Sequence, residues 1–164
     1  MLAIEPLPEP TDTPPSVDET IRLTATTAAL ESLHDLIARF WAAIDAAPLP
    51  TIAEVQRLSF VTAIIEIGGN IIRYSYPPAA PGPIELRLLA WPDRLEARYT
   101  DAGVPYTPPA PSPPAEHPLD LSDGEELPEG GYGMQIARAA LDALDYRRTD
   151  DGRNRWTLLS RIRA

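Results

Sequence analysis

The spacing of apolar residues predicts an amphipathic helix near the start of the chain. Leu33, Ile37, Phe40 and Ile44 recur at intervals of three and four residues, which places them on one face of a helix over residues 28–45. Exposing such an apolar face to water is unfavourable, so we expect it to pack into a hydrophobic core.

A second helix is expected to follow directly. Thr51 and Glu54 have the spacing of a capping box, in which each side chain bonds the backbone of the other residue. The helix is therefore expected to begin at Thr51 and to continue to about Tyr74. Its expected core stripe consists of Val55, Leu58, Val61, Ile65 and Ile72.

Alternating apolar and polar residues predict five strands. Residues 130–144 are expected to pass from a glycine cluster into a third helix. The order strand, helix, helix, hairpin, helix, hairpin predicts an α+β fold, a two-layer sandwich of a mostly antiparallel sheet with helices on one face. The strands are expected at residues 19–25, 84–91, 94–100, 146–149 and 153–162, with turns at Pro92-Asp93 and Asp150-Asp151-Gly152.

Proline-rich stretches set the expected domain organisation. Residues 1–17 are expected to form a flexible tail before one domain over residues 18–164. Residues 104–129 are rich in proline and acidic residues and fit no helix or strand pattern. A segment of that length is typical of a functional lid or a disordered insert.

Composition narrows the classes of function. The net charge of −10 argues against general affinity for nucleic acid or anionic membranes. The chain has no cysteine, which excludes disulfides and thiolate metal sites. No signal peptide or transmembrane segment is recognisable at the start, so we expect a cytoplasmic protein.

The first candidate for chemistry lies within the second helix. Glu66 and Asn70 are four residues apart and share one helical face. A carboxylate and an amide placed in this way can serve as a base and a metal ligand, although a solvated polar face has the same pattern. Gly68 and Gly69 each cost about 1 kcal/mol in a helix interior, so we expect a close approach there.

Two further candidates contain glycine. Asp101 and Gly103 end a strand, where they could hold a ligand or form a plain turn. The run Gly130-Gly131-Tyr132-Gly133 opens a helix, where backbone N–H groups can point at phosphates, although a flexible linker has the same composition.

Taken together, these clusters resemble the N, G1 and G2 boxes of the GHKL, or histidine kinase-like, ATPases, and in detail the anti-sigma-factor serine kinases. Those kinases carry a pattern like E-A-x-x-N-x-x-x-H-A-Y, which matches Glu66, Asn70 and the run Tyr74-Ser75-Tyr76, with Tyr74 in place of the usual histidine. The run DAGVPYTPP resembles their G1 box, D-x-G-x-P-F-D-P, and GGYGMQIAR resembles their G2 region. The run from Gly152 to Leu158 is similar to their terminal G-x-N-R-x-T-L.

The resemblance implies a set of roles. ATP and Mg²⁺ would lie between the second helix and a lid over residues 104–129. Asp101 would bond the adenine amino group, aided through water by Thr157, and Gly103 would lie beside the base. Asn70 would ligate Mg²⁺, and Glu66 would be the catalytic base. The glycines that would let the lid wrap the phosphates are Gly130, Gly131 and Gly133.

The implied biology is partner switching. The resemblance implies an ATP-dependent serine/threonine kinase that sequesters a sigma factor and phosphorylates an anti-anti-sigma antagonist, and it allows a homodimer. A non-catalytic, nucleotide-gated binding module is the alternative: Glu66 favours the kinase, and the loss of the histidine at Tyr74 favours the binder. A detached ATPase domain of a histidine kinase is disfavoured by the G1 sequence.

Overall fold

The computed structural model describes residues 7, 12–108 and 133–163. These residues form five strands and three helices. Their bounds are β1 (Val17–Thr24), α1 (Ala29–Ala46), α2 (Glu54–Tyr74), β2 (Pro83–Trp91), β3 (Arg94–Asp101), α3 (Gly133–Ala140), β4 (Ala143–Arg148) and β5 (Asn154–Arg161).

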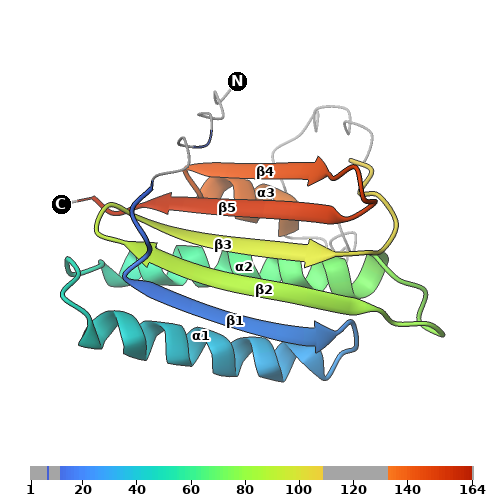
Figure 1. The fold of residues 1–164 in the computed structure, drawn as a ribbon, viewed down its shortest axis with the longest axis horizontal. Helices are drawn as coiled ribbons and strands as arrows, with labels where there is room; N and C mark the ends of the chain where they lie inside the picture. Colours follow the sequence, from blue (N-terminus) through green and yellow to red (C-terminus); the bar gives the residue numbers. More distant parts are fainter. Residues whose placement is uncertain (1–6, 8–11, 109–132, 164) are drawn as a thin grey trace, which may run out of the picture.

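All five strands form one antiparallel sheet in the order β1-β2-β3-β5-β4. The three helices lie together behind this sheet (Figure 1). The two predicted turns are present, between β2 and β3 and between β4 and β5, and Gly152 adopts a positive φ of 79° in the second. The predicted α+β sandwich is confirmed.

The core lies between the sheet and the helices. The predicted face of α1 is buried as expected, with Leu33, Ile37, Phe40 and Ile44 all at most 5% exposed. From the sheet, Tyr99 reaches into α2, where its hydroxyl donates to the carbonyl of Ile64 at 2.8 Å.

The predicted start of α2 is wrong. The helix begins at Glu54, and Ala53 at its N-cap makes no side-chain bond to it. Ile52 is only 3% exposed. Burial of this side chain holds the preceding segment outside the helix, so Thr51 cannot form the capping box.

The predicted core stripe of α2 is also wrong at its start. Val55 and Leu58 are 73% and 65% exposed. The helix is apolar on several faces, and by length and composition alone it could cross a membrane, but it packs in the core of the sandwich. The side chains that α2 buries fully are Phe60, Ala63, Ile64, Ile67 and Ile71.

Other boundaries differ more modestly. Helix α3 ends at Ala140, four residues before the predicted end, and β4 begins at Ala143 instead of Tyr146. Residues 1–6, 8–11 and 109–132 lie outside the described residues. The lid and most of the flexible tail therefore stay predictions, but Val17, the last residue of the predicted tail, begins β1, and the N–H of Ser16 donates to the carbonyl of Ala90 at 2.8 Å.

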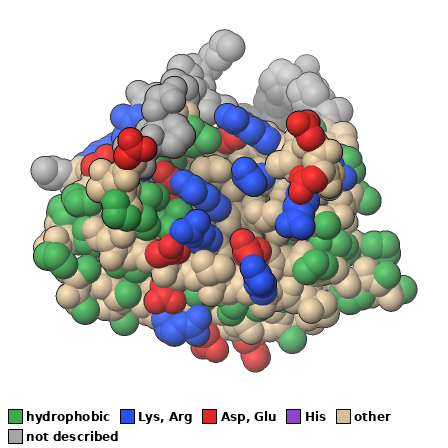
Figure 2. Space-filling view, viewed as in Figure 1, with side chains coloured by type: hydrophobic (Ala, Val, Ile, Leu, Met, Phe, Trp, Pro, Cys, Tyr) green, Lys and Arg blue, Asp and Glu red, His purple; other side chains and the backbone are tan. Residues whose placement is uncertain are grey.

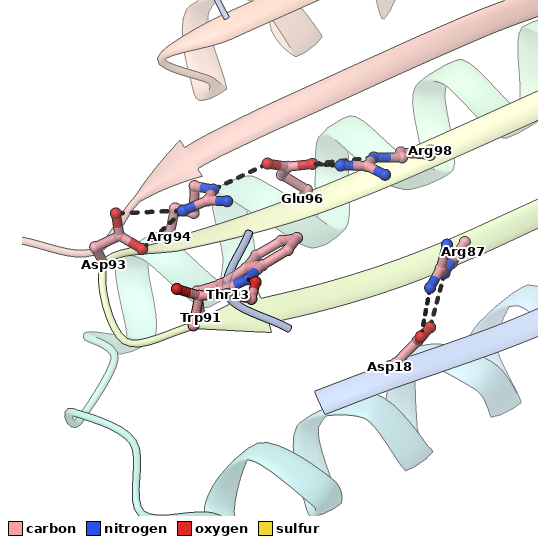
Figure 3. Close-up of polar contacts among 8 residues, drawn as sticks. All are labelled: Thr13, Asp18, Arg87, Trp91, Asp93, Arg94, Glu96 and Arg98. Carbon is pink, nitrogen blue, oxygen red and sulfur yellow. Dashed lines mark hydrogen bonds and ion pairs between the residues drawn. The ribbon is translucent and has the colours of Figure 1, made fainter. Parts of the chain in front are cut away.

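The sheet face away from the helices carries charged side chains of both signs (Figure 2). Arg87 holds Asp18 through two bonds of 2.9 and 2.6 Å. Glu96 bridges Arg94 and Arg98 on the next strand (Figure 3). The Asp18–Arg87 pair is exposed and adds little stability, whereas Arg94 and Glu96 are only 6% and 5% exposed. None of these residues lines the pocket described below.

Candidate functional site

The first part of the site lies on α2. Glu66 and Asn70 are both half-buried on the helix, four residues apart. Helix α3 packs against α2, and a Cβ at Gly133 would collide with Oε2 of Glu66. The start of α3 therefore lies directly against the Glu66 carboxylate, and a larger residue at this position would have to displace that side chain.

The second part is the carboxylate of Asp101, the last residue of β3. The residue is 2% exposed. Its Oδ1 accepts from the backbone N–H of Gly103 at 2.9 Å and from Nδ2 of Asn154 at 2.8 Å. Its Oδ2 is buried and has no hydrogen-bond partner among the described residues. A buried acceptor without a partner costs about 1–3 kcal/mol, so this oxygen fits a ligand that brings a donor.

A backbone contact within the fold explains why residue 103 is glycine. A Cβ there would collide with the backbone carbonyl of Ser75, and the next N–H, of Val104, donates to that same carbonyl at 2.8 Å. The group that lies against Gly103 is thus the end of α2. The glycine sets how closely the β3 loop approaches the helix.

Tyr76 connects the end of α2 to the segment that follows β3 and to the start of β2. Its hydroxyl accepts from the N–H of Ala102 at 2.8 Å and donates to the carbonyl of Pro83 at 2.7 Å. Burial, with a contribution from the Asp101 charge, raises the pKa of Tyr76. The phenol therefore stays neutral and keeps its proton for this bond.

A pocket of about 290 Å³ opens between α2, the segment after β3, α3 and β5. One wall contains the rings of Tyr106 and Trp156, whose centroids lie 4.8 Å apart, and Tyr146, which is not part of the lining, packs 5.5 Å from Tyr106. The pocket is mostly apolar with a few amides, as small-molecule sites are. It is lined by Asn70, Ile71, Tyr74, Ser75, Val104, Pro105, Tyr106, Thr107, Met134, Asn154 and Trp156.

Thr157 is not brought to this site. It pairs with Arg98 across the sheet, and Arg98 bonds Glu96 on the face away from the helices. Directly opposed residues of an antiparallel pair share a face. The β5 side chain that meets Asp101 is Asn154, which lies in the same terminal motif but which the motif pattern did not single out.

The glycine run that the family resemblance assigns to phosphate binding is only partly described. Gly133 begins α3, while Gly130 and Gly131 lie outside the described residues. The described part of the chain has no group of three or more His, Asp or Glu side chains that could hold a metal. A magnesium ion on Asn70 would thus take most of its ligands from phosphate oxygens and water, as Mg²⁺ commonly does.

Comparison with known proteins agrees with this geometry. Residues 26–158 match the family model of the histidine kinase-like ATPase domain. The chain belongs to this family. The match spans the described site from α2 to β5.

A curated relative of this ATPase domain is serine/threonine-protein kinase BtrW of Bordetella bronchiseptica. It is 33% identical over 107 residues, which cover 63% of this chain and 71% of BtrW. A solved structure, the RsbU and RsbW domains of Rv1364c from Mycobacterium tuberculosis, matches 90% of this chain with a TM-score of 0.58 and 19% identity. The chain spans 33% of that longer protein, and the likeness supports the fold. The family inferred from the motifs is confirmed, while the roles of single residues stay predictions.

Proposed function

We propose that this chain is an ATP-binding anti-sigma regulatory factor with protein serine kinase activity. It sequesters a sigma factor and phosphorylates an anti-anti-sigma antagonist, in the cytoplasm. Membership of the ATPase family and the name of the relative BtrW support this proposal. The observation that carries it is the buried Oδ2 of Asp101, which lacks a donor among the described residues.

Each part of the site has a role in this proposal. Asp101 accepts a hydrogen bond from the adenine amino group, and the pocket beside it receives the base. Asn70 offers its amide oxygen to Mg²⁺. When bound, ATP would supply the phosphoryl group, and Mg²⁺ would neutralise the charge on the phosphates. The backbone around Gly131 and Gly133 donates to the phosphates at the start of α3.

Glu66 has the catalytic role. It takes the proton from the serine hydroxyl of the antagonist as that oxygen is phosphorylated, which is general-base catalysis. Its half-buried position beside Asn70 keeps the carboxylate near the metal ligand on one face of α2. The Glu66 carboxylate also lies against Gly133, so the proposed base is next to the start of α3.

A non-catalytic binding module is the second candidate. The observation that favours it is Tyr74, which lines the pocket and is 60% exposed where the anti-sigma kinases carry a histidine. In this case nucleotide binding would alter the affinity for a partner without phosphorylating it.

Nucleotide binding is tested first, by calorimetric titration with Mg·ATP. Asp101→Asn should weaken binding about 10- to 100-fold. Asn154 and Gly103 both donate to Oδ1, so the new amide keeps its oxygen there and presents its NH₂ group to the adenine amino group. Asp145→Asn on β4 is the matched control, since Asp145 bonds Arg147 in an exposed pair, and should bind normally. Unchanged affinity in Asp101→Asn would contradict the adenine contact.

Phosphotransfer is tested next, with radiolabelled ATP and a purified candidate antagonist. The kinase proposal expects label on an antagonist serine. ATP-dependent partner binding without any label would instead support the non-catalytic module.

A further inference from the structure

The Asn154 amide uses its full hydrogen-bonding capacity in the wall of the pocket. Its Nδ2 donates to Oδ1 of Asp101 and to the carbonyl of Val104, both at 2.8 Å. Its Oδ1 accepts from the Tyr146 hydroxyl and from Nη1 of Arg148, both at 2.8 Å. The residue is 1% exposed. No capacity is left for a ligand, so Asn154 can act on one only through its neighbours.

The orientation of this amide is fixed by its partners. Arg148 can only donate, so the amide oxygen must face it. The Tyr146 hydroxyl accepts from the N–H of Tyr106 at 2.9 Å, which leaves its own proton for Asn154. The NH₂ group is therefore held toward Asp101, because a flipped amide would set oxygen against a carboxylate.

This orientation gives the two carboxylate oxygens of Asp101 different surroundings. Oδ1 receives both the Asn154 amide and the Gly103 N–H. Oδ2 receives no donor from the described residues. One oxygen is thus occupied by the protein, and the other is left as a fixed acceptor.

We infer that Asn154 is a positioning residue that sets base selectivity. By holding Oδ1, it presents Oδ2 of Asp101 as an acceptor that accommodates an exocyclic amino group and rejects a ring oxo group. The inference rests on the proposed nucleotide site and adds how one base is selected. A purine with an oxo group at the same position would place acceptor against acceptor and leave Oδ2 unsatisfied.

The test compares Mg·ATP with Mg·ITP, which carries an oxo group where adenine has its amino group. The wild-type protein should prefer ATP by about 10- to 100-fold in Kd. Asn154→Asp has nearly the same size and keeps the bonds to Tyr146 and Arg148, but it loses the donors to Asp101 and to the Val104 carbonyl. A proton shared by the two adjacent carboxyl groups would also let one of them donate to an oxo group. The preference for ATP should therefore fall toward one.

A second variant avoids changing a buried residue. Arg148→Met removes one of the two donors that orient the amide, at an exposed position at the end of β4. It should lower the ATP preference by a smaller factor than Asn154→Asp. Arg147→Met is the matched control, because the neighbouring Arg147 bonds Asp145 instead, and it should keep the wild-type preference.

The outcomes separate the two ideas. If Asn154 were only structural, both nucleotides would lose affinity equally and the ratio would not change, which would overturn the inference while the proposed function stood. If Asn154→Asp does not fold, an unchanged ratio in Arg148→Met would overturn it. Absence of ATP binding by the wild-type protein would overturn both.

Discussion

Adjacent glycines in α2 should respond in opposite ways to alanine. Both Gly68 and Gly69 are interior to the helix, where alanine is favoured over glycine by about 1 kcal/mol. The two positions differ in what an added Cβ meets. At Gly68 it would stand 2.5 Å from the Tyr99 hydroxyl oxygen and 2.9 Å from Cδ1 of Leu33. At Gly69 it would stand 3.0 Å from Nη2 of Arg73.

These neighbours differ in their freedom to move. Tyr99 and Leu33 are 0% and 1% exposed, and the Tyr99 hydroxyl is bonded to Ile64. Overpacking such a site costs about 1–3 kcal/mol, and losing the hydroxyl bond about 1 kcal/mol more. Arg73 is exposed, so its flexible end can move aside. We expect Gly68→Ala to lower the free energy of unfolding by about 1–3 kcal/mol and Gly69→Ala to raise it by about 0.5–1 kcal/mol.

Urea unfolding followed by circular dichroism measures both variants. For a chain of this size, 1 kcal/mol corresponds to about 2–4 °C in Tm, so a thermal scan should also separate them. Tyr99→Phe adds a partner test: without the hydroxyl, Gly68→Ala should cost about 1 kcal/mol less, which a double-mutant cycle reports. Equal shifts of the same sign in the two alanine variants would refute the packing argument.

Two further predictions concern catalysis and acid stability. Glu66→Gln should leave Mg·ATP binding unchanged and lower phosphoryl transfer to the antagonist by about 10²–10⁴-fold. Asn70→Ala should also weaken Mg²⁺-dependent nucleotide binding. Undiminished transfer by Glu66→Gln would exclude Glu66 as the base. The bonds from Arg87 hold the pKa of Asp18 below its ordinary value of 3.8, so this pair stabilises the fold above that pH and loses its effect as the pH falls through the lowered pKa. Asp18→Asn should therefore cost up to about 1 kcal/mol at pH 7, and this cost should shrink as the pH is lowered through and below the ordinary pKa of 3.8 in urea unfolding. A cost that does not change with pH would contradict this.

Local patterns in the sequence predicted most elements because one physical preference dominated each. The face of α1 is a single apolar stripe, and Pro92-Asp93 can only be a turn between two alternating runs. The buried face of α2 could not be predicted from local patterns because the helix is apolar on several faces. Its buried side was decided by contacts with the sheet, such as Tyr99 against Gly68, which no local pattern contains.

The glycines show a different limit of sequence reasoning. Close approach was expected at Gly68 and Gly69, and the structure provides it through Tyr99, Leu33 and Arg73. For Gly103 the same reasoning left open a ligand or a plain turn, and the group that an added Cβ would meet is the Ser75 backbone. A glycine in the sequence signals that something comes close, but only the fold identifies what it is.

The geometry of a strand explains why Asn154, and not Thr157, lies beside Asp101. Successive residues point to opposite faces, so a residue three positions away lies on the other side of the sheet. The pairing of Asp101 with Asn154 fixes which residues of β5 face the helices, and this register depends on where β3 ends and the turn at Gly152 begins. Motif spacing alone did not give that register. Once it is known, the residue beside Asp101 must be Asn154, and the hydrogen bonds around its amide then decide which oxygen of the carboxylate is left without a donor among the described residues.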